Sequence, residues 1–323
     1  MRRRALLLGA PLLAAFPAPT FAAPAFPTRQ VHFIVPFGPA GGVDFTARVV
    51  ADALGSVWST PVLIENKAGA GGIIGTQVAA RSAPDGYTML LGSIGTLSIN
   101  PAIRSRLPYD AERDFVPVAR LTDVPNVLVV RTGLAAQSVK EVIALARANP
   151  DTLTYSSAGI GTSNHMAGEL FQHMTGVRMR HVPYRGGNTM DLVSGLVDMS
   201  FDNLPTALPH IRTGRLRALA VTGLKRSVTA PDLPTIAEAG VPGFDVVGWV
   251  GLFAPSGTPQ PVVDDARKAV VEVLARPEVI EKLMQQGAEA AGAADQPGFA
   301  AFLTADRKKW KELATDAGIK DPD

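Results

Sequence analysis

The sequence predicts an α/β protein of two lobes. Short apolar runs alternate with amphipathic runs, and this alternation is typical of parallel strands joined by helices. Glycine-rich loops separate strand from helix at three places. No flexible linker or low-complexity segment divides the chain, so we expect it to cross between the lobes more than once.

The first series of elements begins at an apolar strand over residues 31–36. A helix follows, with Val43, Ala47, Val50 and Leu54 on one face. The Pro84-Asp85-Gly86 turn precedes the last strand of this series. The predicted elements are strands over 31–36, 62–64 and 87–91 and helices over 42–54 and 73–81.

The second series begins near Asn126. A helix within it ends at Asn149-Pro150, because proline cannot continue a helix. After residue 231 a Pro- and Gly-rich stretch carries one more strand, and an amphipathic helical tail follows. The predicted elements are strands over 127–130, 153–156, 197–201, 216–221 and 246–253, and helices over 138–148, 163–174 and 190–194.

The N-terminus has the layout of a secretory signal peptide. Three arginines precede an apolar run from Ala5 to Phe16 that is too short to span a membrane. The small residues Thr20 and Ala22 predict a signal over residues 1–22 and export of a soluble mature protein. Arg3-Arg4 also fits a loose twin-arginine pattern, so the Sec and Tat export routes both stay open.

Charge and cysteine content narrow the class of protein. The chain has 31 Lys+Arg and 29 Asp+Glu, and removal of the three signal arginines leaves 28 minus 29, a net charge of −1. This balance gives no indication of nucleic-acid binding. There is no cysteine, so stability must come from burial, for which a 46% hydrophobic content is ample.

Three glycine-rich loops carry the functional signal. Glycine lets the backbone approach a ligand, and a helix N-terminus offers unpaired N–H groups with a partial positive charge. The pattern therefore indicates a site that holds an anion without reacting with it. The loops are Gly38-Pro39-Ala40-Gly41-Gly42, Gly69-Ala70-Gly71-Gly72 and Gly159-Ile160-Gly161-Thr162.

Nucleotide and hydrolase motifs fit poorly. The glycines from Gly69 to Gly75 approach a dinucleotide fingerprint, but Glu65-Asn66-Lys67 separates them from the strand, and no acidic residue stands about 20 positions on. The segment around Ser93 lacks the first glycine of G-x-S-x-G. Ser93 is either a pocket hydroxyl or a strand-end residue.

Several polar residues have both a structural and a functional interpretation. His165, Glu169 and His173 share one helix face and allow a metal site, although an amphipathic helix explains the same spacing and no fourth ligand is evident. Thr162 either only caps the helix that follows it, or it also borders a site in which a ligand carboxylate binds beside the cap. Asp44 favours the first turn of its helix, where its charge is stabilised.

Two charged residues are candidates for ligand recognition. Arg185, in a glycine-rich turn, either pairs with a ligand carboxylate or is a solvated surface charge. Asp202 follows a strand, where open α/β sheets bind ligands. An acid there repels a carboxylate but accepts from an amine or hydroxyl, so Asp202 is a specificity candidate.

Together and in order, these motifs resemble the Bug (TctC-type) extracytoplasmic receptors of tripartite tricarboxylate transporters. The likeness runs from about Val31 to the C-terminus. It rests on Val35-Pro36-Phe37 with Asp44, Glu65-Asn66, Pro84-Asp85-Gly86-Tyr87-Thr88, Gly159-Ile160-Gly161-Thr162 with His165, Pro183-Tyr184-Arg185-Gly186-Gly187, Pro234-Thr235 with Glu238 and Gly240, and Trp249 with Ala254-Pro255.

The resemblance implies a two-lobe type II periplasmic binding protein fold whose cleft closes on a small organic carboxylate. Residues 23–125 and 223–323 then form lobe 1, and residues 126–222 form lobe 2. A monomeric receptor is implied, with no cofactor, metal or catalytic residue, that hands a di- or tricarboxylate, aromatic acid or amidated acid to membrane transporter subunits. The candidate ligand contacts are Phe37, Ala40, Gly41, Gly42, Asp44, Gly69, Ala70, Gly71 and Ser93 on lobe 1 and Ser156, Ser157, Gly161, Thr162, His165, Arg185, Gly187, Asn188 and Asp202 on lobe 2.

The sequence departs from the family pattern at one place, and two other functions are alternatives to the transport receptor. Ala40-Gly41 stands where the family typically has two glycines, so the Ala40 methyl group bears on how closely a ligand approaches. The chain is alternatively a receptor for a membrane sensor kinase, or a secreted hydrolase or lyase with His165 as base.

Overall fold

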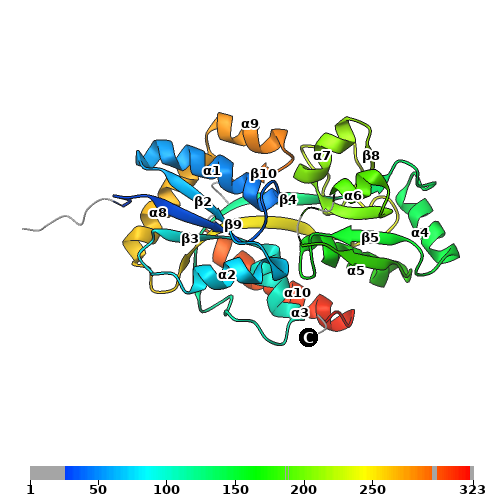
Figure 1. The fold of residues 1–323 in the computed structure, drawn as a ribbon, viewed down its shortest axis with the longest axis horizontal. Helices are drawn as coiled ribbons and strands as arrows, with labels where there is room; N and C mark the ends of the chain where they lie inside the picture. The colour runs from blue at the N-terminus through cyan, green and yellow to red at the C-terminus, as the bar shows by residue number, and fades with distance from the viewer. Residues whose placement is uncertain (1–25, 186, 188, 293–296, 321–323) are drawn as a thin grey trace, which may run out of the picture.

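The computed structural model describes residues 26–185, 187, 189–292 and 297–320. Two α/β lobes lie side by side along the long axis of the molecule (Figure 1). The predicted signal over residues 1–22 lies outside the described residues. None of the helices within the described part is both long and apolar enough to cross a membrane.

The sheet of the first lobe has the order β2-β1-β3-β9-β4. Its strands β1, β2 and β3 are parallel, with β1 between the other two. The strand β9 runs antiparallel to both β3 and β4, and β10 pairs with β4. The bounds are Val31–Val35 for β1, Val62–Asn66 for β2, Thr88–Ser93 for β3, Phe115–Arg131 for β4, Val247–Pro255 for β9 and Glu289–Ala290 for β10.

The sheet of the second lobe uses the far half of β4. This half pairs antiparallel with β7 and β8, and β7, β5 and β6 are mutually parallel. One strand of 17 residues therefore belongs to both sheets. The remaining bounds are Thr154–Ser157 for β5, Arg180–Pro183 for β6, Met199–Asn203 for β7 and Leu216–Val221 for β8.

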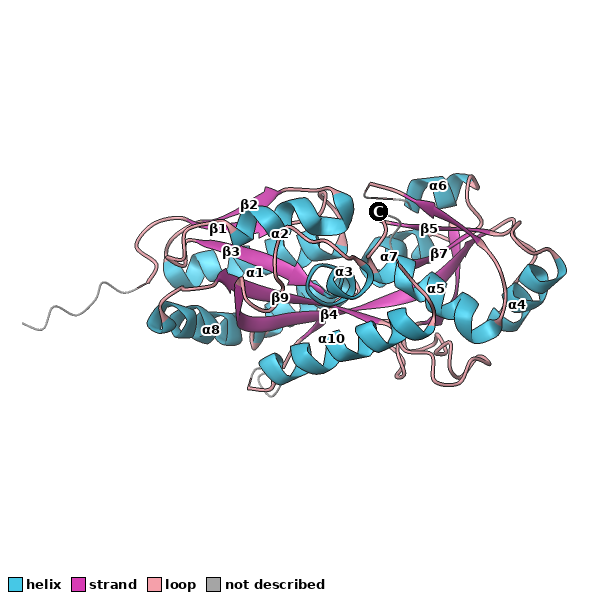
Figure 2. Cartoon of the chain, turned by 90° about the horizontal axis from the view of Figure 1, so that it is seen from below, coloured by secondary structure: helices cyan, strands magenta, loops and turns pink. Residues whose placement is uncertain are grey.

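Helices cover both sheets (Figure 2). Those of the first lobe and the tail are α1 (Gly42–Trp58), the short helix η1 (Ala70–Gly72), α2 (Ile73–Ala80), the π-helical turn η2 (Gly95–Ile99), α3 (Asn100–Ile103), α8 (Gln260–Leu274), α9 (Pro277–Gln285) and α10 (Phe299–Asp316). Those of the second lobe are α4 (Val139–Ala148), α5 (Ser163–Thr175), α6 (Thr189–Ser194) and α7 (Leu204–Arg212).

One apolar core extends through both lobes. This cluster reaches from Leu90 of β3 to Phe171 of α5 and includes Trp310 of α10. Asp306 of α10 accepts hydrogen bonds from the indole N–H of Trp249 at 2.9 Å and of Trp310 at 3.2 Å. The C-terminal helix is thereby tied to β9 at the junction of the lobes.

Three chain segments cross between the lobes at one place. Thr222, at the end of β8, donates its hydroxyl to the carbonyl oxygens of Asn126 at 3.0 Å and Val246 at 2.6 Å. The segment before Val246 packs on the second lobe, where the Phe244 ring lies 6.3 Å from that of Phe171. The lobe boundary at residue 223 stays a prediction, and this packing favours a crossing near residue 247.

The prediction missed the first half of β4, the strands β6 and β10, and the helical segments η1, η2, α3 and α7. The first half of β4 contains Pro117 and Pro125, and it pairs with β9 in an irregular register. The helix α7 was not predicted at all. It begins with Pro205 in its first turn, where proline is tolerated, and contains Pro209.

Candidate functional site

A cavity of about 480 Å³ lies between the lobes, lined by residues of both. The loop from Phe37 to Val43 and residues 93–95 line it from the first lobe. The start of α5, the start of α6 and one face of α7 line it from the second lobe. Val124 and residues 248–250 line it at the crossing strands.

The N-terminus of α1 opens onto this cavity. Gly41 is the N-cap residue and supplies no side-chain hydrogen bond to the helix. The first amides of a helix have no partner within it, so an uncapped start leaves N–H groups for a ligand. Gly41 and Gly42 both line the cavity.

Asp44 holds the loop before α1 in place rather than lining the cavity. Its side chain is 2% exposed and accepts from the Ala40 amide at 2.9 Å and from the Arg48 guanidinium at 2.9 and 3.0 Å. Asn66 donates to Asp44 and to the Phe37 carbonyl oxygen. Burial raises the pKa of Asp44, but hydrogen bonds from Arg48, Asn66 and Ala40 outweigh it and lower that pKa overall.

Ala40 has a left-handed backbone, with a φ of 62°. An L-residue with a side chain is strained in this region, whereas glycine adopts it freely. The Ala40 amide is bonded to Asp44, and its residue lines the cavity. The alanine that stands at position 40 in place of the family's glycine therefore adds a methyl group to the loop, while its amide is already bonded to Asp44.

The N-terminus of α5 faces the same cavity from the second lobe. Thr162 caps it by accepting from the His165 amide, and Ser163 and Asn164 line the cavity. The Ser163 hydroxyl and the Asn203 amide group both donate to the Asn126 side-chain oxygen, at 3.3 and 2.8 Å. This buried network fixes the start of α5 at the place where β4 enters the second lobe.

Asp202 is buried and faces the cavity. Its carboxyl group accepts from the hydroxyls of Thr189 at 2.8 Å and Thr206 at 2.9 Å and from the Asn203 amide at 2.8 Å. Burial raises the pKa of Asp202 above its ordinary value, and these hydrogen bonds offset only part of the rise. His210, on α7, also lines the cavity.

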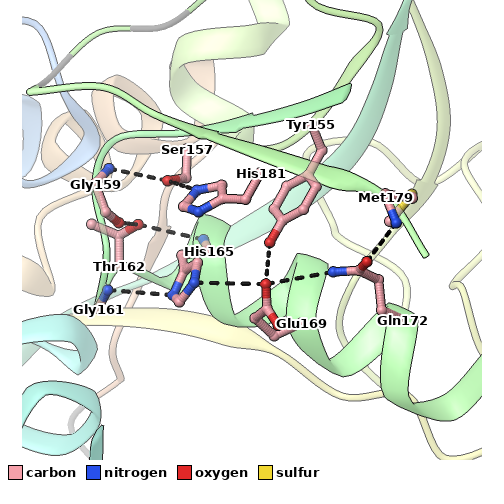
Figure 3. Close-up of polar contacts among 10 residues, drawn as sticks. All are labelled: Tyr155, Ser157, Gly159, Gly161, Thr162, His165, Glu169, Gln172, Met179 and His181. Carbon is pink, nitrogen blue, oxygen red and sulfur yellow. Dashed lines mark hydrogen bonds and ion pairs between the residues drawn. The ribbon is translucent and has the colours of Figure 1, made fainter. Parts of the chain in front are cut away.

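Two neighbouring histidines, His165 and His181, lie behind the third glycine loop, with ring centroids 4.5 Å apart (Figure 3). The Ser157 hydroxyl lies 2.7 Å from His181 Nε2 and accepts from the Gly159 amide, while His165 Nδ1 accepts from the Gly161 amide at 3.4 Å. Burial is the main cause that lowers the pKa of His165 to about 3 and that of His181 to about 4. Both rings are therefore neutral, and they position the loop from behind.

Further polar contacts follow along α5 beyond His165. Glu169 lies 3.7 Å from His165 Nε2 and accepts from the Tyr155 hydroxyl. His173, one turn further along α5, is exposed and takes no part. Across the described part of the chain, no three His, Cys, Asp or Glu side chains gather as a metal site would require. His165, Glu169 and His173 thus lie on one helix, α5, with only the first two in contact.

The second glycine loop meets the third loop directly. A Cβ atom on Gly71 would lie 2.3 Å from the Ile160 carbonyl oxygen, and one on Gly161 would lie 2.0 Å from the Asn100 side-chain oxygen. Asn100 also donates to the Gly71 carbonyl oxygen at 3.1 Å. The two lobes thus touch each other at these loops, with backbone against backbone.

The predicted site residues fall into three groups. Eight line the cavity: Phe37, Ala40, Gly41, Gly42, Ser93, Thr162, Gly187 and Asp202. Nine lie outside its lining: Asp44, Gly69, Ala70, Gly71, Ser156, Ser157, Gly161, His165 and Arg185, of which Arg185 is exposed. Asn188 lies outside the described residues. Direct contact of any of them with a ligand stays a prediction.

Sequence reasoning missed several lining residues. Thr206 and His210 belong to α7, the helix that was not predicted, and Thr189 starts α6. Trp249 lies on β9, where the apolar run gave no sign of which side chains face the cavity. The proline after Asn203-Leu204 was the available signal for the start of α7.

Comparison with known proteins agrees with this geometry. Residues 46–319 match the family model described as the tripartite tricarboxylate transporter family receptor, TctC. The periplasmic binding protein BugD is 35% identical, with a TM-score of 0.86 over 92% of this chain and 100% of its own.

Two further solved structures contain ligands. Rpa4515 of R. palustris with adipate is 37% identical, with a TM-score of 0.87 over 91% of this chain and 99% of its own. MatC from Rhodopseudomonas palustris with bound malate is 32% identical, with a TM-score of 0.85 over 89% of this chain and 99% of its own. The predicted two-lobe periplasmic binding fold is confirmed by these likenesses.

Proposed function

This chain belongs to the tripartite tricarboxylate transporter receptor (TctC) family, and from that premise we propose that it captures a small organic carboxylate in the periplasm. One observation carries the proposal: the N-termini of α1 and α5, from opposite lobes, face one cavity. Each offers unpaired amides and a partial positive charge to an anion. A carboxylate is the class of ligand that similar structures hold, as adipate and malate.

The proposed mechanism is closure of the cleft. The amides of the two helix ends act together on one anion only when the lobes meet, so the ligand binds the closed state more tightly than the open state. The contact between Gly71 and Ile160 belongs to that closed state. Helix-end amides recognise carboxylate in general, so di- and tricarboxylates, aromatic acids and amidated acids all remain within the proposal.

The binding test starts from the purified protein. Native mass spectrometry identifies any acid that the closed receptor retains. A thermal-unfolding screen with succinate, adipate, citrate and benzoate then ranks the classes, and calorimetry gives Kd. A ligand at about 100 times its Kd stabilises the folded state by about 2.7 kcal/mol, which raises Tm by several degrees. Folded protein that carries no acid and responds to none of these probes contradicts the proposal.

We further propose that the receptor delivers its ligand to membrane transporter subunits. Residues 1–22 act as the export signal in this proposal, and the receptor is monomeric. Pull-down from membranes with and without the acid found above tests the partner. Ligand-dependent recovery of transporter subunits is expected, whereas recovery of a sensor kinase alone would replace delivery by signalling.

The enzyme alternative has less support. Its candidate base, His165, is 7% exposed, bonds to the loop behind the cavity and is absent from the residues that line it. Incubation of the bound acid with protein, followed by mass spectrometry, tests the point, because a receptor returns the acid intact.

A further inference from the structure

A second cavity, of about 730 Å³, lies beside the helices α3 and α10 of the first lobe. It is lined by Ser98 of η2, by α3 and the chain that follows it, and by two residues of α10. The helices α3 and α10 lie next to each other (Figure 1, Figure 2). The residues that line this α3–α10 cavity are all different from those that line the cavity between the lobes, so the two cavities are separate.

Arg307 of α10 is held at the α3–α10 cavity by backbone contacts. Its Nε atom donates to the Leu97 carbonyl oxygen at 2.9 Å, and its Nη2 atom donates to the Ala111 carbonyl oxygen at 2.7 Å. The Nη1 atom lies 3.7 Å from a carboxylate oxygen of Glu112, which is too long for a hydrogen bond. Burial lowers the pKa of Arg307 below its ordinary value, and the attraction of nearby acids offsets only part of the fall. The guanidinium is therefore a fixed cation whose charge is only partly compensated.

Two further hydrogen-bond donors line the same cavity. Ser98 is 1% exposed, and its hydroxyl group makes no hydrogen bond to any described residue. Lys311 follows Arg307 by one helical turn on the same face of α10, and it forms no ion pair within the described part of the chain. A buried hydroxyl group without a partner costs free energy, so Ser98 calls for an acceptor.

The acids that line the α3–α10 cavity are bonded within their own loop. Asp110 Oδ1 accepts from the backbone amides of Glu112 at 2.9 Å and Arg113 at 3.0 Å. Asp114 Oδ2 accepts from the Asp110 amide at 2.7 Å, and Glu112 is exposed. These contacts fix the loop between α3 and β4 and leave the donors of η2 and α10 for another acceptor.

We propose that the α3–α10 cavity is a second ligand site, which takes a small organic anion. An oxyanion, either a carboxylate or a phosphate group, accepts from Ser98, Arg307 and Lys311 together. Apolar surface for the body of the ligand comes from the lining residues Pro101, Leu107 and Pro108. The site goes beyond the proposed carboxylate function, because the residues that line the cavity between the lobes take no part in it.

The second site is linked to the contact between the lobes. Arg104 lines the α3–α10 cavity and donates from Nε to the Asn100 side-chain oxygen at 3.3 Å. Asn100 donates to the Gly71 carbonyl oxygen, and its own side-chain oxygen is the atom that a Cβ on Gly161 would meet. An anion beside Arg104 attracts the guanidinium and changes its bond to Asn100. Occupancy of the second site therefore alters the affinity of the cavity between the lobes, and this coupling, which rests on the proposed carboxylate function, is reciprocal.

Crystallography and calorimetry with phenyl phosphate, benzoate and neutral benzamide test the second site. The crystals locate each probe, so binding in the α3–α10 cavity is distinguished from binding between the lobes. At pH 7, at least one of the two anions is expected to bind there about tenfold more tightly than benzamide. The anion that binds more tightly identifies phosphate or carboxylate as the preferred group.

Variants of the donors show whether the anion binds where we propose. The double variant Ser98→Ala with Lys311→Gln is expected to weaken binding of the anion by about tenfold. Lys311→Gln alone, at an exposed position, gives a second route should the double variant fail to fold, and it is expected to weaken binding by about threefold. Lys308→Gln is the matched control, because Lys308 lies on α10, pairs with Glu312 and does not line the cavity.

The coupling is measured as the Kd of succinate, adipate or citrate, whichever binds between the lobes, with and without saturating phenyl phosphate or benzoate. A change of about threefold or more is expected. Asn100→Ala should remove most of this change and leave anion binding in the α3–α10 cavity intact, because Asn100 does not line that cavity.

The outcomes separate the second site from the proposed function. Absence of both anions from the α3–α10 cavity, or binding of benzamide as tight as theirs, overturns the second site and leaves the carboxylate receptor standing. So does anion binding that neither Lys311→Gln nor the double variant weakens. An anion bound there that leaves the Kd between the lobes unchanged overturns the coupling. Folded protein that holds an anion in the α3–α10 cavity but no acid between the lobes overturns the proposed function and supports the second site.

Discussion

Gly71 and Ile160 face each other across the contact between the lobes, with room for backbone only. A Cβ atom on Gly71 would lie 2.3 Å from the Ile160 carbonyl oxygen. This distance is far shorter than any real Cβ contact, so a side chain at Gly71 must push the lobes apart or distort one loop. Closure of the cleft thus depends on the absence of a side chain at one position.

Gly71→Ala is expected to weaken ligand binding by about tenfold or more, because the closed state becomes less accessible. Calorimetry with the acid identified for the wild type measures the loss. Gly214→Ala is the matched control, since Gly214 has a similar φ of 68° but nothing within 4 Å of its Cβ position. Equal effects of the two variants would mean that backbone strain, and not the lobe contact, is responsible.

Ala40→Gly is expected to raise the free energy of unfolding by about 0.5 kcal/mol. Relief of the left-handed strain gains about 1–2 kcal/mol, and the greater freedom of glycine in the unfolded chain offsets part of it. Urea unfolding measures the difference. Ala144→Gly, at an exposed position inside α4, should instead lower stability by about 0.5–1 kcal/mol. Destabilisation by both variants would contradict the account of Ala40.

Asp44→Asn is expected to lower the free energy of unfolding by about 2 kcal/mol at pH 7, because Arg48 loses its charged partner. The pKa of Asp44 is lowered by folding, so its contribution is complete above the ordinary value of 3.8 and is lost as the pH falls through the folded-state pKa. Wild type and variant should converge in acid. Asp265→Asn, on the exposed side of α8, serves as the neutral control.

His165 and His181 make the free energy of unfolding depend on pH at higher pH values than Asp44 does. Their pKa values of about 3 and about 4 lie below the ordinary 6.5, so the unfolded chain takes up protons first. Their contribution is present above pH 6.5, and falls by about 1.4 kcal/mol per pH unit and per histidine as the pH drops towards 4.

His181→Gln should remove the part of this slope that His181 contributes, measured as urea unfolding between pH 7 and about pH 4.5. His173→Gln, at an exposed position of α5, is the control for the exchange of histidine for glutamine itself. Nuclear magnetic resonance of the native imidazoles gives an independent check. A protonated His181 ring in the folded protein at about pH 5.5 would contradict the burial argument.

Local signals predicted most of the fold. The first strand and helix were expected over 31–36 and 42–54 and are found over Val31–Val35 and Gly42–Trp58, because hydrophobic periodicity and glycine both act locally. The first half of β4, which contains Pro117 and Pro125, was not predicted. Its strand conformation depends on pairing with β9, some 130 residues further along the chain, and no local pattern reports such pairing.

The candidate site was predictable in kind but not in detail. Phe37, Gly41 and Thr162 were identified because a glycine loop before a helix is visible in sequence. The sequence does not reveal that Gly71 meets the opposite lobe while Gly42 meets the cavity, since both stand in similar loops. Only the relative placement of the lobes separates these roles.

The intrinsic fluorescence of Trp249 should report on ligand binding in the cavity. It is one of three tryptophans, it lines the cavity, and its indole N–H is bonded to Asp306 of α10. Indole emission responds to the polarity and charge around the ring, so occupancy of the cavity should register in the intrinsic fluorescence without any attached dye. The other two, Trp58 and Trp310, lie outside the lining and supply a constant background.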